Sequence, residues 1–247
     1  MKHWLRVQVE KVLRRYGYEL KIIDDPMRGF AASLAFARSL GLNPKTVFDV
    51  GVGYGTRWLY DAFPDAKFVL FEPMDVFEGD LTKLERELGA DVHRVALADR
   101  TGHATFRFNS HFPTSSSLYA MDPRTERYLR CVQGEHEFTE RTVQLETLDG
   151  LNTYEPPYVL KLDVEGGDLA VIRGAVRTLA NTDLVVSEVS VMRRYQGEPS
   201  FATVIRTLDQ LGFELFDIPS LAQANGNGAL LYLDAMFVKK DSKLWPR

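Results

Sequence analysis

The sequence predicts an α/β protein built on a parallel β-sheet and preceded by an N-terminal helical extension. Short apolar runs, typical of buried strands, end in an acidic residue, as Val47-Phe48-Asp49 does. Segments with apolar residues at helical spacing separate these runs, and this alternation indicates parallel strands joined by right-handed crossovers. The first run leads into a turn with glycines at alternate positions, where a ligand can approach the backbone closely.

The individual elements follow from apolar spacing and from the positions of glycine and proline. Gly41 and Gly89 are natural helix C-caps, and Pro64 ends the short helix after the glycine turn. Residues 3–16 form an amphipathic helix with basic residues off its apolar face; we expect a solvated face, with an anionic-partner surface as the alternative. Helices are expected at 3–16, 30–40, 57–63, 77–88, 169–179 and 201–211, and strands at 46–50, 67–72, 91–97, 103–108, 142–145, 158–163, 183–188, 213–216 and 230–239, the last bent at Asp234.

The composition does not indicate a nucleic-acid or membrane surface. The chain has 247 residues, a formal net charge of −4, 45% hydrophobic residues and 26% charged residues, which is ordinary for a globular protein. Its single cysteine, Cys131, cannot form an intramolecular disulfide, and neither a signal peptide nor a spanning segment is visible. We therefore expect a cytoplasmic protein that acts on a small molecule, without a nucleic-acid or membrane partner; the oligomeric state is not predicted.

The glycine turn suits one of two nucleoside ligands. A dinucleotide fingerprint starting at Gly51 would need a third glycine at position 56, where Thr56 stands. The observed spacing places glycines at 51, 53 and 55, directly after Asp49, and resembles the first motif of class I S-adenosylmethionine (SAM) methyltransferases. Glu72, at the end of the second strand, does not distinguish a SAM-binding from a dinucleotide-binding fold, because NAD-binding folds also place an acidic residue there. A plain tight turn before a helix is the remaining alternative.

Five blocks in a fixed order resemble the FkbM-type SAM-dependent methyltransferases, over roughly residues 45 to 240. The resemblance implies a doubly wound, mostly parallel seven-stranded sheet with its last strand antiparallel. It also implies O-methylation, often of a hydroxyl on a sugar or secondary metabolite. The sequence departs from the family at Val52-Gly53-Tyr54, where Ala-Asn is more usual, and at Gly167-Asp168, where an aromatic residue and Glu are more usual. The blocks are Phe48-Asp49-Val50-Gly51, Phe71-Glu72-Pro73, Val95-Ala96-Leu97-Ala98-Asp99 with Gly102 and Phe106, Ser116-Ser117-Leu118, and Leu160-Lys161-Leu162-Asp163-Val164-Glu165-Gly166.

Four predicted strands end in acids, and ligands of open α/β sheets bind at that edge. SAM carries an ammonium, a sulfonium and two ribose hydroxyls, all of which favour carboxylates. Helix N-capping is the alternative reading of each acid except Glu72. The expected SAM contacts are Asp49, orienting the glycine turn or meeting the ammonium; Gly51, Gly53 and Gly55 at the methionine part; Glu72 at the ribose; Ala96 and Leu97 along the adenine; and Asp163 below the methyl group.

The acceptor site is expected between the end of the fourth strand and the polar segment 109–141, called the insert below. The insert is too long for a plain connection, so it is a lid, a substrate loop or a disordered segment. We predict Asp163 and Glu165 as the catalytic pair, with His111 and His136 as alternative bases. Ser115, Ser116, Ser117 and His111 are predicted to bind the acceptor.

Neither a metal motif nor a catalytic triad is present, although Asp163 and Glu165 with a further acid could hold Mg²⁺. The predicted organisation is an N-terminal extension, 1–44, followed by a SAM-binding methyltransferase domain, 45–240. Two other classes stay open: a nicotinamide-dependent oxidoreductase, and a non-catalytic SAM- or nucleoside-binding module.

Overall fold

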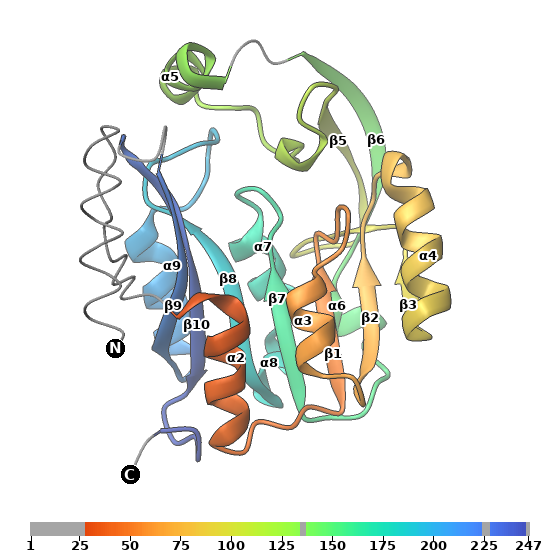
Figure 1. Cartoon of the computed structure of the whole chain (residues 1–247). Coiled ribbons are helices and arrows are strands. Elements are labelled where there is room, and N and C mark those ends of the chain that lie inside the picture. The colour runs from red at the N-terminus through yellow and green to blue at the C-terminus, as the bar shows by residue number, and fades with distance from the viewer. Residues whose placement is uncertain (1–27, 134–136, 224–227, 246–247) are drawn as a thin grey trace, which may run out of the picture.

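The computed structural model describes residues 28–133, 137–223 and 228–245. A seven-stranded sheet with the order β3-β2-β1-β7-β8-β10-β9 forms the centre, and a three-stranded sheet with the order β4-β6-β5 stands above one of its edges (Figure 1). The large sheet consists of β1 (Thr46–Val50), β2 (Lys67–Phe71), β3 (Asp91–His93), β7 (Tyr158–Leu162), β8 (Thr182–Ser190), β9 (Phe213–Gln223) and β10 (Leu230–Lys239).

The parallel strands β2, β1 and β7 lie side by side in the large sheet. All residues of β1 and β7 are buried, as expected for parallel strands covered on both faces. Val50 pairs with both Phe71 and Leu162, so the three strands end level with one another. Their carboxyl ends therefore present the residues that follow them at one common edge.

The last strand, β10, is antiparallel to both of its neighbours, β8 and β9. The pairing with β9 shifts register between Asp234 and Met236, at the point where the sequence predicts a bend. This arrangement confirms the predicted seven-stranded, mostly parallel sheet with an antiparallel last strand.

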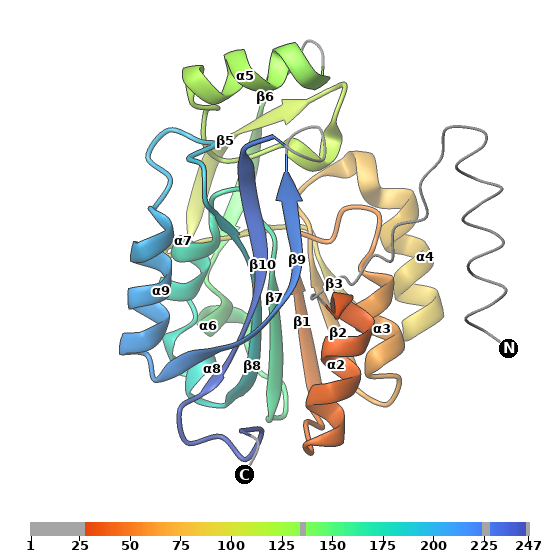
Figure 2. The same cartoon turned by 60° about the vertical axis from the view of Figure 1, so that its left-hand side comes forward.

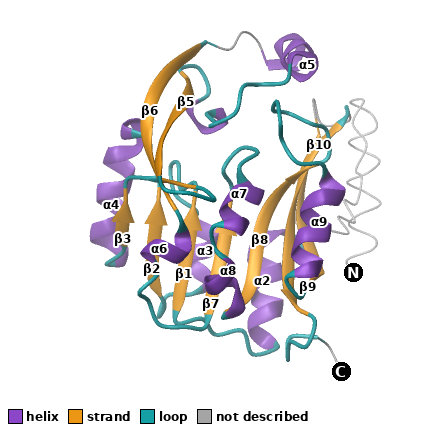
Figure 3. Cartoon of the chain, turned by 180° about the vertical axis from the view of Figure 1, so that it is seen from behind, coloured by secondary structure: helices purple, strands orange, loops and turns teal. Residues whose placement is uncertain are grey.

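Helices cover both faces of the large sheet, which confirms the doubly wound architecture. One face packs against α2, α3 and α4, and the other against α6, α7, α8 and α9, as seen from behind in Figure 3. Each helix buries aliphatic residues at helical spacing, such as Leu81 and Leu84 of α4. The bounds are α2 Gly29–Ser39, α3 Arg57–Ala62, α4 Glu78–Leu88, α6 Leu148–Leu151, α7 Asp168–Arg173, α8 Val176–Ala180 and α9 Phe201–Gln210, with a 3₁₀ turn, η1, at Asp75–Phe77.

The predicted strand 91–97 is wrong as one element, because it divides between the two sheets. β3 ends at His93, and β4 (Ala96–Leu97) pairs instead with β6, where Ala96 lies opposite Leu145. The predicted helix 169–179 is also two helices, broken at Gly174. A Cβ atom there would lie 2.0 Å from the carbonyl oxygen of Ala98, so glycine is needed for this close approach.

The insert carries secondary structure above the carboxyl edge of the large sheet (Figure 2). β5 (Gly102–Asn109) and β6 (Phe138–Glu146) pair along their length, further than predicted, with η2 (Pro113–Ser115) and α5 (Pro123–Gln133) between them. The backbone of the insert also bonds to the loop after β8, where Asp122 N donates to Arg194 O at 2.8 Å. The insert is thus held both by β5 and β6, which lead into it, and by the loop after β8.

Two expectations about the ends of elements differ from the structure. β8 continues past Glu188 to Ser190, and β9 is longer than the predicted 213–216. The predicted helix 30–40 is confirmed as α2, whereas the amphipathic helix predicted at 3–16 lies outside the described residues. Among the described helices, none is both long and apolar enough to cross a membrane.

Candidate active site

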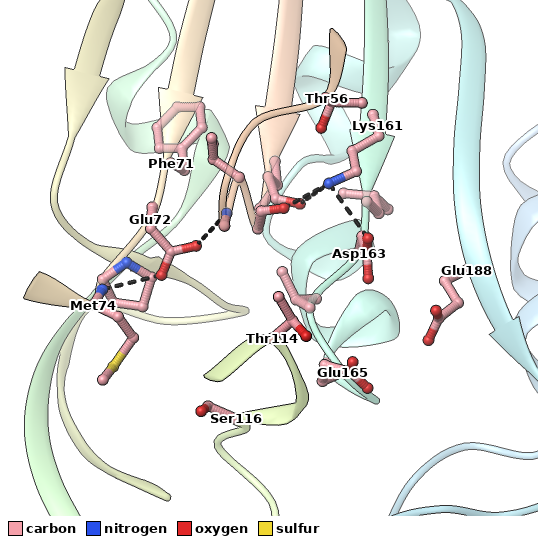
Figure 4. Close-up of a pocket in the computed structure, with 18 of the residues that line it drawn as sticks. Thr56, Phe71, Glu72, Met74, Thr114, Ser116, Lys161, Asp163, Glu165 and Glu188 are labelled. Atoms are coloured by element: carbon pink, nitrogen blue, oxygen red, sulfur yellow. Dashed lines mark hydrogen bonds and ion pairs between the residues drawn. The ribbon is translucent and has the colours of Figure 1, made fainter. Parts of the chain in front are cut away.

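A cavity of about 360 Å³ opens at the carboxyl edge of the large sheet. Its walls come from the glycine turn, the ends of the parallel strands, β10 and the first part of the insert. In the close-up of Figure 4, Glu72 and Glu188 lie on opposite sides, with Asp163 between them. The acids predicted to meet at this edge are therefore grouped around one cavity, apart from Asp49, which lies beneath it.

The glycine turn after β1 depends on the absence of side chains. Gly51, Gly53 and Gly55 have φ values of +77°, +52° and +106°, a region that other residues rarely adopt. Gly51 is the most constrained, since a Cβ atom there would lie 1.8 Å from the carbonyl oxygen of Asp163. The turn is therefore pressed against the end of β7, and all three glycines line the cavity.

Lys161 of β7 holds this turn from below, a role that was not predicted from the sequence. Its Nζ atom donates to Gly51 O at 2.6 Å and lies 3.0 Å from Asp49 Oδ1 and 3.6 Å from Asp163 Oδ2. Burial disfavours the lysine cation, but the charges of Asp49 and Asp163 outweigh it, so the pKa of Lys161 is raised. A lysine inside the apolar run Val159-Leu160-Lys161-Leu162 was the available signal.

Asp49 lies underneath the turn and has no exposed surface. Oδ2 accepts a hydrogen bond of 2.6 Å from the Tyr60 hydroxyl, and Oδ1 forms the ion pair with Lys161 without the angle of a hydrogen bond. Of the two roles predicted for Asp49, this position favours orienting the turn over meeting a ligand ammonium.

Glu72 follows β2 and links the two turns at that side of the cavity. Its oxygens accept backbone hydrogen bonds of 3.0 Å each from Gly53 N and Met74 N (Figure 4). Burial raises the pKa of Glu72, opposed by these two donors and by Lys161. Each carboxylate oxygen can accept a further bond, so the group can still receive hydroxyls from a ligand.

Ala96 and Leu97, the predicted adenine contacts, line the same cavity from β4. Both are buried, as is Phe71, whose ring stacks on His93 with centroids 5.0 Å apart. Together they give this part of the cavity an apolar wall, which suits a planar base.

Three carboxylates, including that of Asp163, lie close together on the side of the cavity opposite Glu72. One oxygen each of Asp163, Glu165 and Glu188 lies within 4.8 Å of the others. Arg194 reaches Glu165 and Glu188 from behind: Nη1 lies 2.9 Å from Glu165 Oε2, and Nη2 contacts Glu188 Oε1. Tyr195 donates its hydroxyl to the same Glu165 oxygen at 2.8 Å. A protein cation therefore already compensates two of the three acids, and we assign no metal to this cluster.

Burial is the largest influence on the pKa values of Glu165 and Glu188. It raises the pKa of Glu165 and of Glu188, the latter strongly, while Arg194 opposes the shift in both. Asp234 of β10, which also lines the cavity, has a pKa raised to about 6 by burial. Asp234 and its neighbour Tyr232 were not predicted as site residues, because their position depends on β10 being inserted beside β8.

The insert supplies one of the four residues predicted to bind the acceptor. Ser116 lines the cavity, with Thr114 beside it, whereas Ser115, Ser117 and His111 are not part of its described wall. Ser117 Oγ instead donates to the carbonyl oxygen of Glu165 at 2.7 Å. His136, one of the two alternative bases, lies outside the described residues.

The family was established by comparison with known proteins. The family described as "Methyltransferase FkbM domain" matches residues 49–215, so the chain belongs to this family. It is a SAM-dependent methyltransferase that uses SAM as the methyl donor. This assignment replaces the nicotinamide-dependent oxidoreductase and the non-catalytic binding module as alternatives. A comparison with curated proteins finds no match.

Solved methyltransferase structures are similar to this chain at low sequence identity. The 1,6-didemethyltoxoflavin-N1-methyltransferase of Burkholderia thailandensis is 14% identical, with a TM-score of 0.45 over 89% of this chain and 80% of that one. The magnesium protoporphyrin IX methyltransferase of Synechocystis PCC 6803, solved with SAM, is 11% identical, with a TM-score of 0.44 over 85% and 78% of the two chains.

Proposed function

We propose that the protein methylates a hydroxyl group of a small molecule, such as a sugar or a secondary metabolite. The observation that carries this proposal is Asp163, whose side chain is 44% exposed at the end of β7 inside the cavity. Beyond it, Glu188 and Asp234 add oxygen acceptors, which suit hydroxyl donors of an acceptor molecule. The family resemblance supports the same reaction.

The proposed placement of SAM follows the cavity from one side to the other. The apolar wall of Ala96 and Leu97 takes the adenine, and Glu72 accepts the ribose hydroxyls. The turn at Gly51–Gly55 takes the methionine part, which places the methyl group towards Asp163. Asp49 and Lys161 act beneath this turn by fixing its path.

Glu72→Gln is expected to weaken SAM binding, because it removes the charge that accepts the ribose hydroxyls. Losing one charge-assisted hydrogen bond costs about 1.5–3 kcal/mol, or about 10–150-fold in Kd. Calorimetric titration with S-adenosylhomocysteine measures the change, with Glu78→Gln, at an exposed glutamate, as the control. An unchanged Kd in a folded Glu72 variant would remove this residue from the SAM site.

In the proposed chemistry, the acceptor oxygen attacks the methyl carbon as the carbon–sulfur bond breaks and its electron pair goes to sulfur. Holding the two reactants in line supplies much of the rate. The hydroxyl proton passes to a carboxylate of the Asp163/Glu165 pair. Asp163 is the better placed of the two, since Glu165 already forms an ion pair with Arg194 and accepts a hydrogen bond from Tyr195.

Asp163→Asn is expected to lower turnover by about 10²–10⁴-fold, the usual contribution of a positioned base, with a smaller effect on SAM affinity. The test follows transfer of labelled methyl from SAM to a panel of sugars and polyhydroxylated metabolites, and measures the Kd for SAM alongside. Glu165→Gln and His111→Ala are the matched comparisons. Loss of turnover in the histidine variant, with normal turnover in both acid variants, would overturn this assignment.

We also expect turnover to survive a chelator, because Arg194 supplies the positive charge beside Glu165 and Glu188.

A further inference from the structure

Arg194 lies behind the acidic side of the cavity and is not part of its described wall. Its side chain is 9% exposed, and its guanidinium contacts both Glu165 and Glu188. These two acids come from different parts of the fold, the turn after β7 and the end of β8. Arg194 is therefore a bridge between two walls of the acceptor side.

The position of Arg194 is fixed by bonds other than those to the two acids. Its Nε atom donates to Ser190 Oγ at 3.2 Å, and its backbone nitrogen donates to Glu198 Oε2 at 2.6 Å. Its carbonyl oxygen accepts from Asp122 N of the insert, and its guanidinium lies 4.6 Å from the centre of the Tyr232 ring. A planar guanidinium anchored in this way can hold two carboxylates in fixed places.

The surroundings of the two acids make the arginine charge necessary. Glu165 faces Asp163, Glu198 and Tyr195 besides Arg194. Glu188 faces Asp163, Asp168, Glu165 and, from β10, Tyr232. Among these groups, Arg194 is the cation that opposes both the burial of the two acids and the repulsion of their acidic neighbours. Two largely buried carboxylates without it would be unpaired charges, which are costly in a fold.

We propose that Arg194 is a positioning residue, whose charged guanidinium pairs with Glu165 and Glu188 and holds both carboxylates in place on the acceptor side of the cavity. It acts through these acids and touches neither reactant. The effect of Arg194 on turnover rests on the proposed methyl transfer. Its effect on the stability of the folded protein does not depend on that proposal.

The test compares Arg194→Met, which removes the charge, with Arg194→Lys, which keeps it. An acid whose pKa is raised in the folded state contributes stability below its ordinary pKa, near 4.5, and loses it as the pH rises through the raised value. Removing Arg194 raises the pKa of both acids further. We therefore expect the Met variant to lose about 3–5 °C more in melting temperature than the wild type when the pH is raised from about 5 to about 8. The Lys variant should stay closer to the wild type.

Arg193→Met, at the exposed neighbouring arginine, is the control and should follow the wild type at both pH values. If Arg194→Met does not fold, Arg194→Met/Glu188→Gln should fold, because it removes one unpaired carboxylate. In the methyl-transfer assay, the acidic limb of the pH–rate profile should move to higher pH in the Met variant and back in the Lys variant.

An equal loss of melting temperature at both pH values, shared by the Met and Lys variants, would mean that Arg194 only fills space and would overturn the proposal. So would a double variant that stays unfolded beside a folded Lys variant. The melting experiment uses no substrate, so it can fail while methyl transfer is observed, or succeed while no hydroxyl acceptor is methylated.

Discussion

Gly51→Ala is expected to destabilise the protein by about 3–5 kcal/mol, combining a strained positive φ with a steric clash. The added Cβ would lie 1.8 Å from the carbonyl oxygen of Asp163, a backbone atom that cannot rotate away. Relief requires the glycine turn to separate from the end of β7. That movement would also displace the carbonyl of Gly51 from Lys161, so SAM binding should fall together with stability.

Urea unfolding and SAM titration of Gly51→Ala, beside Gly53→Ala, measure this effect. Gly53 also has a positive φ, +52°, but the nearest atom to its Cβ would be Thr114 Cγ2 at an ordinary 3.7 Å. The free energy of unfolding of the Gly53 variant should fall by only about 1–2 kcal/mol, the cost of a left-handed backbone conformation for alanine. Equal losses in the two variants would show that the contact with β7 does not limit the turn.

Lys161→Met is expected to destabilise the protein by about 3–5 kcal/mol, the usual cost of removing one partner of a buried ion pair. Methionine fills similar space, so the loss comes from the charge and its hydrogen bond. Asp49 would keep its bond from Tyr60 but lose the cation 3.0 Å from its other oxygen. The carbonyl of Gly51 would lose its donor at the same time.

A double variant separates these contributions. Asp49→Asn/Lys161→Met should recover much of the stability, since no buried charge is left unpaired, but should still bind SAM weakly, because the glycine turn lacks its support. Lys45→Met, at an exposed lysine just before β1, controls for the loss of a lysine. A single Lys161 variant as stable as this control would contradict the proposed role of the buried pair.

The parts of the fold that depend on local chemistry were predictable. Apolar runs ending in acids located four strands of the large sheet, β1, β2, β7 and β8, and glycine spacing located the turn that lines the cavity. Glu72 and Asp163 were placed at the carboxyl edge because parallel strands present their ends there. These inferences use only residues close together in sequence.

The missing parts depend on pairing between distant segments. Residues 91–97 were predicted as one strand, but Ala96 leaves the large sheet because β6 offers it a partner 49 positions away, at Leu145. Arg194 joins the site only because the loop after β8 folds back over Glu188, and no local pattern indicates that return. Asp234 likewise reaches the cavity through the insertion of β10 between β8 and β9.

A crystal structure of the complex with S-adenosylhomocysteine tests the proposed site most directly. We expect the ribose hydroxyls to bind the carboxylate of Glu72, the adenine to lie against Ala96 and Leu97, and the sulfur atom to face Asp163. A ligand with its ribose away from Glu72, or with its sulfur directed away from Asp163, would contradict the placement on which the proposed chemistry depends.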